Sequence, residues 1–200
     1  MTLADQALRL NFTGKRRLPP LLLVTDATRL PDPMAAAARL PPGSGVVLRH
    51  YDAADRPQLA RRLAAVARQR RLALLVAGDW RLAAAVGAAG LHLPEGLARH
   101  GVLAPLLGWV RRRGALLSIA AHSPAALARA RRLGAAGAVL SPVFATRSHP
   151  GAPVIGPLRF SAWIRRAGLP VHALGGIGTA TAARLKHSGA AGLAAIGALG

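Results

Sequence analysis

The chain lacks cysteine and has few acidic, lysine or aromatic residues. Its 200 residues contain no Cys, seven Asp and Glu together, and 4% aromatic residues. The absence of Cys excludes disulfides and thiolate metal sites. No apolar run reaches the roughly 18 residues of a membrane span, and residues 1–11 lack the apolar core of a signal peptide. The sequence therefore predicts a cytoplasmic protein with no membrane partner.

Acidic residues are scarce enough that the chain carries a net charge of +20, almost all of it from arginine. Many arginines fall near the ends of expected helices, where cations complement the helix dipole. They are Arg68, Arg70, Arg71, the run 111–113, Arg131, Arg132, Arg165 and Arg166. Because aromatic stacking residues are rare as well, we expect no specific nucleic-acid binding. Weak adhesion to polyanions would be a property of the surface.

Short apolar runs of strand length recur with Ala-, Leu- and Arg-rich segments between them. The eight expected strands are 21–25, 46–49, 72–77, 90–93, 116–120, 138–141, 171–174 and 193–196. The expected helices between them are 55–69, 81–86, 124–133, 157–167 and 179–187. Alternation of strand and helix predicts parallel strands with right-handed crossovers.

The tetrapeptide Gly-Ala-Ala-Gly occurs at 87–90, 134–137 and 189–192, each time between a helical pattern and an apolar run. It marks a helix that ends on glycine before the next strand starts. Eight such units predict a single (β/α)8 TIM-type barrel over residues 20–200, with 1–19 as a short N-terminal helix or arm. The chain stops just after the eighth strand, so the last helix is expected to be missing or truncated. An open doubly wound sheet is the alternative.

The segment 169–178 is an apolar run that breaks into the glycines Gly175, Gly176 and Gly178 before a helical pattern. Glycines let a phosphate approach backbone N–H groups, which the start of the next helix supplies. This stretch is typical of a buried strand that ends in a phosphate loop. An ordinary turn from strand to helix is the alternative.

Other polar residues fall where the expected strands end, which is the functional face of a barrel. Arg49 is suited to clamp a phosphate, Asp79 to hold Mg²⁺ bound to a pyrophosphate, and His122 to move protons near neutral pH. The loop 141–156 adds Thr146 and Ser148 between prolines and glycines, a composition suited to a lid over an anionic ligand. Ion pairs that fix loops, a structural histidine and a flexible surface loop are the alternatives.

Taken together, these segments resemble the thiamine phosphate synthases and the related TenI thiazole tautomerases from about residue 20 to 199. The resemblance rests on the segments 22–26, 47–49, 78–79, 90–93, 121–123, 141–146 and 173–177. It implies a barrel that joins hydroxymethylpyrimidine pyrophosphate to thiazole phosphate and releases pyrophosphate with Mg²⁺ bound. The implied partners are phosphorylated pyrimidine and thiazole small molecules.

The resemblance also implies roles for single residues. Arg49 matches the arginine that grips the pyrophosphate, and Asp79 matches the aspartate of an Asn-Asp magnesium motif. Thr146 and Ser148 match hydroxyls of the lid, and the pair 175–176 matches the thiazole-phosphate loop.

Other positions depart from the pattern of the resemblance. The altered positions are Val47, Tyr51, Gly78, Leu97, Ala120, His149 and Gly197, which stand for Gln, Lys, Asn, Asp, Ser, Lys and Ser. His149 and His50 can carry charge when protonated, and Glu95 lies near the vacant metal position. Gly197 keeps its place in the phosphate site without the hydroxyl.

These observations leave three functions open. The leading hypothesis is a thiamine phosphate synthase-like transferase with a depleted pyrophosphate and Mg²⁺ site, in which Arg49, His122 and His149 are catalytic. The alternative is a TenI-like thiazole tautomerase that uses His122, which occupies the position of the proton shuttle. The second alternative is a non-catalytic barrel that binds thiazole phosphate or a partner protein. The sequence leaves open whether the protein forms a homo-oligomer.

Overall fold

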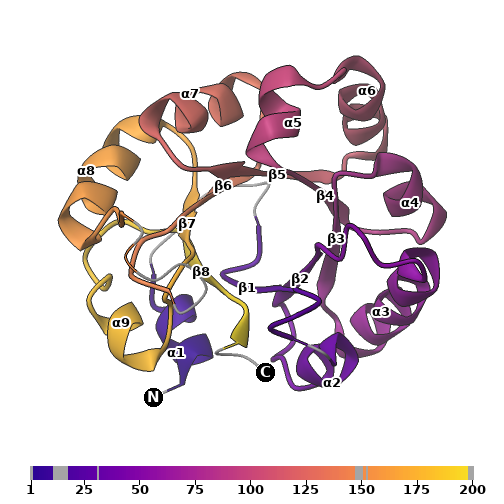
Figure 1. Cartoon of the computed structure of the whole chain (residues 1–200), viewed down its shortest axis with the longest axis horizontal. Coiled ribbons are helices and arrows are strands. Elements are labelled where there is room, and N and C mark those ends of the chain that lie inside the picture. Colours follow the sequence, from indigo (N-terminus) through magenta and orange to yellow (C-terminus); the bar gives the residue numbers. More distant parts are fainter. Residues whose placement is uncertain (1, 11–17, 31, 147–150, 152, 198–200) are drawn as a thin grey trace.

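The computed structural model describes residues 2–10, 18–30, 32–146, 151 and 153–197. Its strands are β1 (Leu21–Val24), β2 (Gly45–Leu48), β3 (Ala73–Ala77), β4 (Gly90–Leu93), β5 (Leu116–Ala121), β6 (Gly137–Leu140), β7 (Val171–Ala173) and β8 (Gly192–Ala195). All neighbours pair in parallel in chain order, and β8 pairs with β1 to close a barrel (Figure 1). The TIM-type barrel is confirmed. An open sheet is wrong because the strands have no free edge.

Helices surround the barrel (Figure 1). They are α1 (Leu3–Leu8), α2 (Pro33–Ala38), α3 (Arg56–Arg70), α4 (Trp80–Ala85), α5 (Glu95–His100), α6 (Ala104–Arg113), α7 (Pro124–Arg132), α8 (Pro157–Ala167) and α9 (Thr179–Ala183). Arginines occupy the last turns of α3, α6, α7 and α8, as the sequence predicts, where they face the negative end of the helix dipole. No helix in the described residues is long and apolar enough to cross a membrane.

Each strand presents alternate residues to the inside and the outside of the barrel. In β1, Leu22 and Val24 pack inside with Val47, whereas Leu21 and Leu23 pack in the outer layer against the helices. A parallel strand buried on both faces needs such an uninterrupted apolar run. The two layers explain why the apolar runs of the sequence mark the strands.

The Gly-Ala-Ala-Gly repeat has the same place in the fold each time. Its last residue is the first residue of β4, β6 and β8. At Gly192 a Cβ atom would lie 2.4 Å from the carbonyl oxygen of Pro20, so the strand start tolerates no side chain. The repeat therefore marks the starts of β4, β6 and β8 at the amino end of the barrel.

The helix α1 lies in the outer ring between α9 and α2, beside β8 and β1 (Figure 1). Leu3 and Ala7 are buried there, and Gln6 Nε2 donates a hydrogen bond to the carbonyl oxygen of Thr179, 3.1 Å away. The described residues contain no α-helix between β8 and Gly197. The N-terminal helix α1 packs on the outer side of β8 and β1.

Candidate active site

The carboxyl ends of the strands carry most of the residues that the sequence predicts to be functional. Arg49 follows β2, Asp79 follows β3, His122 follows β5 and Gly175 follows β7. Since all strands are parallel and the barrel is closed, these residues lie on one rim. The structure therefore gathers the predicted residues at the face where TIM barrels hold their active sites.

Thr25 fixes the backbone that carries Arg49. Its side chain is fully buried at the end of β1, and its Oγ1 accepts a hydrogen bond from the Arg49 N–H at 3.0 Å. The same Oγ1 lies 2.8 Å from Nδ1 of His50. Burial lowers the pKa of His50, which favours the neutral imidazole. His50 is therefore poorly suited to replace a lost lysine charge.

The charge of Arg49 acts over the interior of the barrel. His92 on β4 is buried and lies 3.0 Å from Ser118 Oγ. Its pKa is lowered to about 4, mainly by burial and further by the nearby charge of Arg49. Burial also raises the pKa of Tyr51, and the charge of Arg49 opposes that rise. Arg49 therefore lies near both Tyr51 and His92.

Asp79 joins β3 to α4 and is tied to its neighbours. One carboxylate oxygen accepts a hydrogen bond from the Leu82 N–H at 2.9 Å, which caps α4. The other lies 3.9 Å from Nη1 of Arg56. The Arg56 guanidinium donates to the carbonyl oxygen of Ala77 and stacks over the Tyr51 ring, 5.5 Å from its centre.

Mg²⁺ fits this arrangement only in part. Asp79 is 44% exposed, so a carboxylate is accessible, but the described residues contain no cluster of three acidic, His or Cys side chains that could hold a metal ion. Mg²⁺ binds through one or two carboxylates together with substrate phosphates and water. Asp79 would hold the ion only with a phosphate-bearing ligand, and no step below depends on it.

His122 and Glu95 form the clearest catalytic arrangement on the rim. Glu95 follows β4 as the first residue of α5, and His122 follows β5. Oε2 of Glu95 lies 2.7 Å from His122 Nδ1 and accepts the His122 backbone N–H at 2.9 Å. Because a carboxylate can only accept, Nδ1 is the nitrogen that donates in this pair, and Nε2 is the nitrogen left open to a ligand. The His122 side chain is 55% exposed, so a ligand can reach Nε2.

The loop after β7 packs tightly against the loop after β6. Gly175 and Gly176 have φ angles of +93° and +64°. A Cβ atom on Gly175 would lie 2.8 Å from Cα of Pro142, and one on Gly176 would lie 2.4 Å from the carbonyl oxygen of Ala145. Backbone hydrogen bonds join the same loops, from Val143 N–H to the Leu174 carbonyl at 2.9 Å and from Phe144 N–H to the Gly175 carbonyl at 3.0 Å.

Thr181 fixes the far end of this glycine loop. Its Oγ1 accepts the Gly178 N–H at 2.9 Å and donates to the Gly176 carbonyl at 2.7 Å. The Thr181 side chain therefore ties the start of α9 to the glycine loop. The packing of the loops after β6 and β7 requires both Gly175 and Gly176, so these glycines have a structural explanation besides phosphate binding.

The remaining predicted residues are less informative. Thr146 lies at a partly buried bridge position after β6, and Gly197 is exposed beyond β8. Ser148 and His149 lie outside the described residues, and their expected roles stay predictions.

Arg56 was not singled out in the sequence. It is the first residue of α3, where a cation opposes the helix dipole. That unfavourable position was the signal that could have drawn attention to it. The Arg56 side chain is 12% exposed and spans the space between Asp79 and Tyr51.

The chain matches a known family along most of its length. A family profile described as thiamine monophosphate synthase covers residues 21–199. A protein of Aquifex aeolicus (strain VF5) named "Putative thiamine-phosphate synthase 2" is 33% identical over 153 residues, which are 76% of this chain and 80% of the relative.

Two solved structures show the same fold. Thiamine phosphate pyrophosphorylase from Pyrococcus furiosus has a TM-score of 0.72 at 23% identity, over 94% of this chain and 87% of that chain. The glycerol uptake operon antiterminator regulatory protein from Listeria monocytogenes has a TM-score of 0.58 at 12% identity, over 93% and 95%. Likeness at such identities concerns the fold alone. On the profile and the Aquifex relative, this chain belongs to the thiamine monophosphate synthase and TenI family.

Proposed function

We propose that this protein isomerises a phosphorylated thiazole in thiamine biosynthesis and that His122 moves the proton. The observation that carries the proposal is the hydrogen bond of 2.7 Å between Glu95 Oε2 and His122 Nδ1, on an imidazole that remains accessible. Tautomerisation removes a proton from one substrate atom and returns one to another. It needs a positioned acid and base and no leaving group.

Glu95 would act as the positioning residue of this pair. Its carboxylate holds the ring in one orientation, and it stabilises the positive charge that forms when Nε2 takes a proton from the substrate. Arg49 and the glycine loop 175–176 would bind the phosphate of the same substrate. Their positions on the rim and the family resemblance support these proposed roles.

The second candidate is the synthase reaction, which is favoured by the name of the Aquifex relative and by the placement of Arg49 and Asp79 at neighbouring strand ends. Pyrophosphate departure demands dense positive charge around the leaving group. Tyr51 and Gly78 stand where the family resemblance expects Lys and Asn, and Arg56 is already engaged by Asp79 and Ala77. This distribution of charge favours isomerisation. Weak Mg²⁺ binding and a cytoplasmic location remain predictions.

A side-by-side assay separates the two candidates. The purified protein is given the thiazole phosphate tautomer in one reaction, and both phosphorylated precursors with Mg²⁺ in another. We expect His122→Ala to lower isomerisation about a hundredfold, the scale of a positioned acid or base, with thiazole phosphate affinity changed less than about twofold. His187→Ala is the matched control, because His187 is exposed after α9. Thiamine phosphate formation at ordinary rates that is lost in Arg49→Ala would instead establish the synthase reaction.

A further inference from the structure

The positive charge of the chain is distributed unevenly. All seven acidic residues lie between positions 5 and 95. The stretch 96–200, which spans most of α5 and everything through β8, contains 13 Arg and Lys residues and no Asp or Glu. The described arginines of this half therefore have no carboxylate partner in their own half of the barrel.

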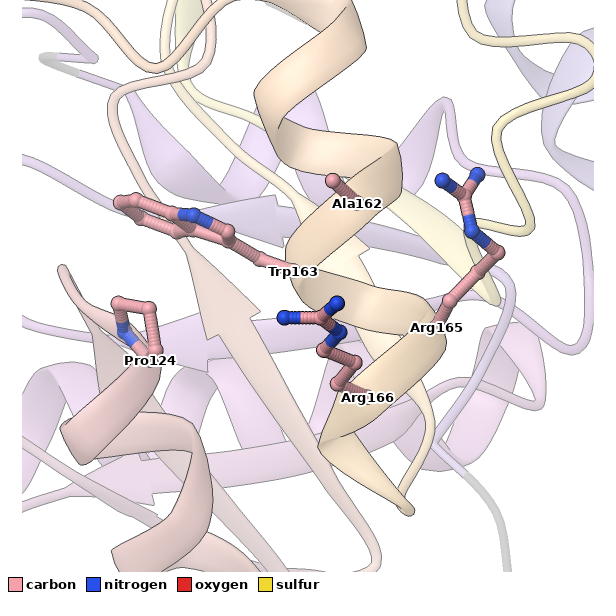
Figure 2. Close-up of a pocket in the computed structure, with 5 residues that line it drawn as sticks. All are labelled: Pro124, Ala162, Trp163, Arg165 and Arg166. Atoms are coloured by element: carbon pink, nitrogen blue, oxygen red, sulfur yellow. The ribbon is translucent and has the colours of Figure 1, made fainter.

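A groove runs over this half of the barrel between α7 and α8, which are neighbours in the outer ring (Figure 1). It consists of two adjoining hollows of about 410 and 300 Å³, which share Pro124, Trp163 and Arg166. In Figure 2, Trp163 and Arg166 extend from α8 toward Pro124 at the start of α7, whereas Arg165 points to the other side of α8. Arg165 there donates a hydrogen bond to Ser161 Oγ at 2.8 Å.

The groove has an apolar end and a cationic end. Pro124, Leu127 and Trp163 line the upper part, near the active-site rim. Arg131, Arg132 and Arg166 lie at the lower part, where α7 and α8 end. Arg131 leans over the last turn of α8, since a Cβ atom on Gly168 would lie 3.0 Å from its Nη1. Exposed Arg132 and Arg166 are thus the cations best placed to meet a ligand.

The dimensions suit a short stretch of polypeptide. From Pro124 to Arg131 the helix rises about 10 Å, which three extended residues can span. One apolar or aromatic side chain would lie against Trp163, and one or two carboxylates would reach Arg132 and Arg166.

Two other occupants suit the groove less well. Single-stranded nucleic acid binds where several aromatic side chains alternate with cations along a track, but Trp163 is the only aromatic residue that lines these two hollows. A second copy bound through the same face would bring arginines against arginines, because a two-fold interface pairs identical surfaces. Charge complementarity therefore favours a different, acidic chain.

We propose that the groove between α7 and α8 binds an acidic peptide segment of a partner protein, through an apolar anchor at Trp163 and carboxylates at Arg132 and Arg166. This site lies on the outside of the barrel and is separate from the proposed isomerisation site. Its upper end is Pro124, two residues after His122, so the partner would lie next to the rim.

Fluorescence anisotropy with a labelled peptide tests the proposal on the full-length protein. The probe carries one Trp next to a run of Glu, and a second probe replaces each Glu by Gln. We expect the double variant Arg132→Glu/Arg166→Glu to weaken binding of the Glu probe about tenfold or more. The control Arg68→Glu/Arg70→Glu makes the same charge change at exposed sites on α3 and should weaken it less than about twofold.

A second variant keeps the net charge unchanged. Trp163→Ala should weaken the Glu probe about tenfold, and circular dichroism checks that the variant is folded. Equal weakening by the groove and control variants would overturn the proposal and point to general surface charge, as would equal binding of the Gln probe. Stronger binding of single-stranded DNA that depends on the groove arginines, or self-association that the groove variant abolishes, would overturn it in favour of those occupants.

Discussion

The carboxylate of Glu95 determines which nitrogen of His122 can react. Because Glu95 Oε2 accepts from both the backbone N–H and Nδ1 of His122, the ring is held by two hydrogen bonds at one residue. Nε2 is the nitrogen left for a substrate. In this respect the pair resembles the orienting carboxylate and imidazole of catalytic triads, without their nucleophile.

Glu95→Gln tests the contribution of the negative charge. The amide oxygen can still accept both hydrogen bonds, but it stabilises a protonated imidazole less well than a carboxylate. We expect kcat for isomerisation to fall about tenfold and KM to stay within about twofold, and steady-state kinetics at a fixed pH measures both. A change confined to thermal stability or KM would show that Glu95 has only a structural role.

At the residue scale, the sequence predicted positions better than partners. Arg49, Asp79 and His122 could be placed on one rim because each follows an apolar run of strand length. The contact between Glu95 and His122 joins residues 27 positions apart, and it depends on the packing of α5 against β5, which no local pattern encodes. Glu95 was expected near the metal position, and in the structure it hydrogen-bonds His122.

At the scale of single elements, the glycine loop after β7 depends on the absence of side chains. Gly176→Ala would place a Cβ atom 2.4 Å from the Ala145 carbonyl oxygen, whereas Gly43→Ala meets nothing within 4 Å. Both residues have positive φ, so Gly43→Ala controls for backbone strain. We expect Gly176→Ala to lower the free energy of unfolding by about 1–3 kcal/mol more than Gly43→Ala, the scale of overpacking.

Urea denaturation of the two variants measures this difference, and calorimetry with thiazole phosphate reports its effect on binding. Gly176→Ala should also weaken the binding of thiazole phosphate, because the loop must move to accept the methyl group. Equal stability and unchanged affinity would mean that the loop adjusts freely and is not part of the site.

The helix α1 contributes to the barrel through one buried face. Leu3 is 4% exposed and Leu8 is 68% exposed on the same six-residue helix. Leu3→Ala should therefore lower the free energy of unfolding by about 2–5 kcal/mol, and Leu8→Ala by less than about 0.5 kcal/mol. Thermal or chemical denaturation compares them, and similar values for both variants would show that α1 does not pack on β1 and β8 in solution.

Elements were predictable where a pattern was long or repeated. The eight strands were found because each is an apolar run, and the Gly-Ala-Ala-Gly repeat marked where three of them start. The helices α2, α5 and α6 were missed. The first two have six residues each, and α6 is interrupted by Gly108, so none shows a sustained helical period. The expected helix 179–187 is shorter, since α9 ends at Ala183.

For the whole molecule, two buried histidines make stability depend on pH. The pKa of His92 and of His172 is lowered from 6.5 to about 4, in both cases mainly by burial. As the pH falls below 6.5, the unfolded chain takes up protons on these rings and the folded protein does not. Stability is therefore fully present above pH 6.5 and is lost as the pH falls toward 4.

His172→Gln tests this linkage. Between pH 6.5 and 4, the free energy of unfolding of the wild type should fall by up to roughly 3 kcal/mol for each buried histidine. His172→Gln keeps only one of the two buried histidines, so its histidine-dependent loss should be about half that of the wild type. Urea denaturation at a series of pH values measures the slope, with exposed His187→Gln as the control. A slope unchanged in His172→Gln would show that the buried ring does not titrate between the two states.

The proton transfer assigned to His122 can be followed directly by running the isomerisation in D2O and detecting deuterium in the product by NMR. The wild type should incorporate deuterium as fast as it forms product, because a proton held on Nε2 exchanges with solvent. His122→Ala should form labelled product about a hundredfold more slowly, while His187→Ala should match the wild type. Isomerisation at the wild-type rate in His122→Ala, or no isomerisation by the wild type, would contradict the proposed function.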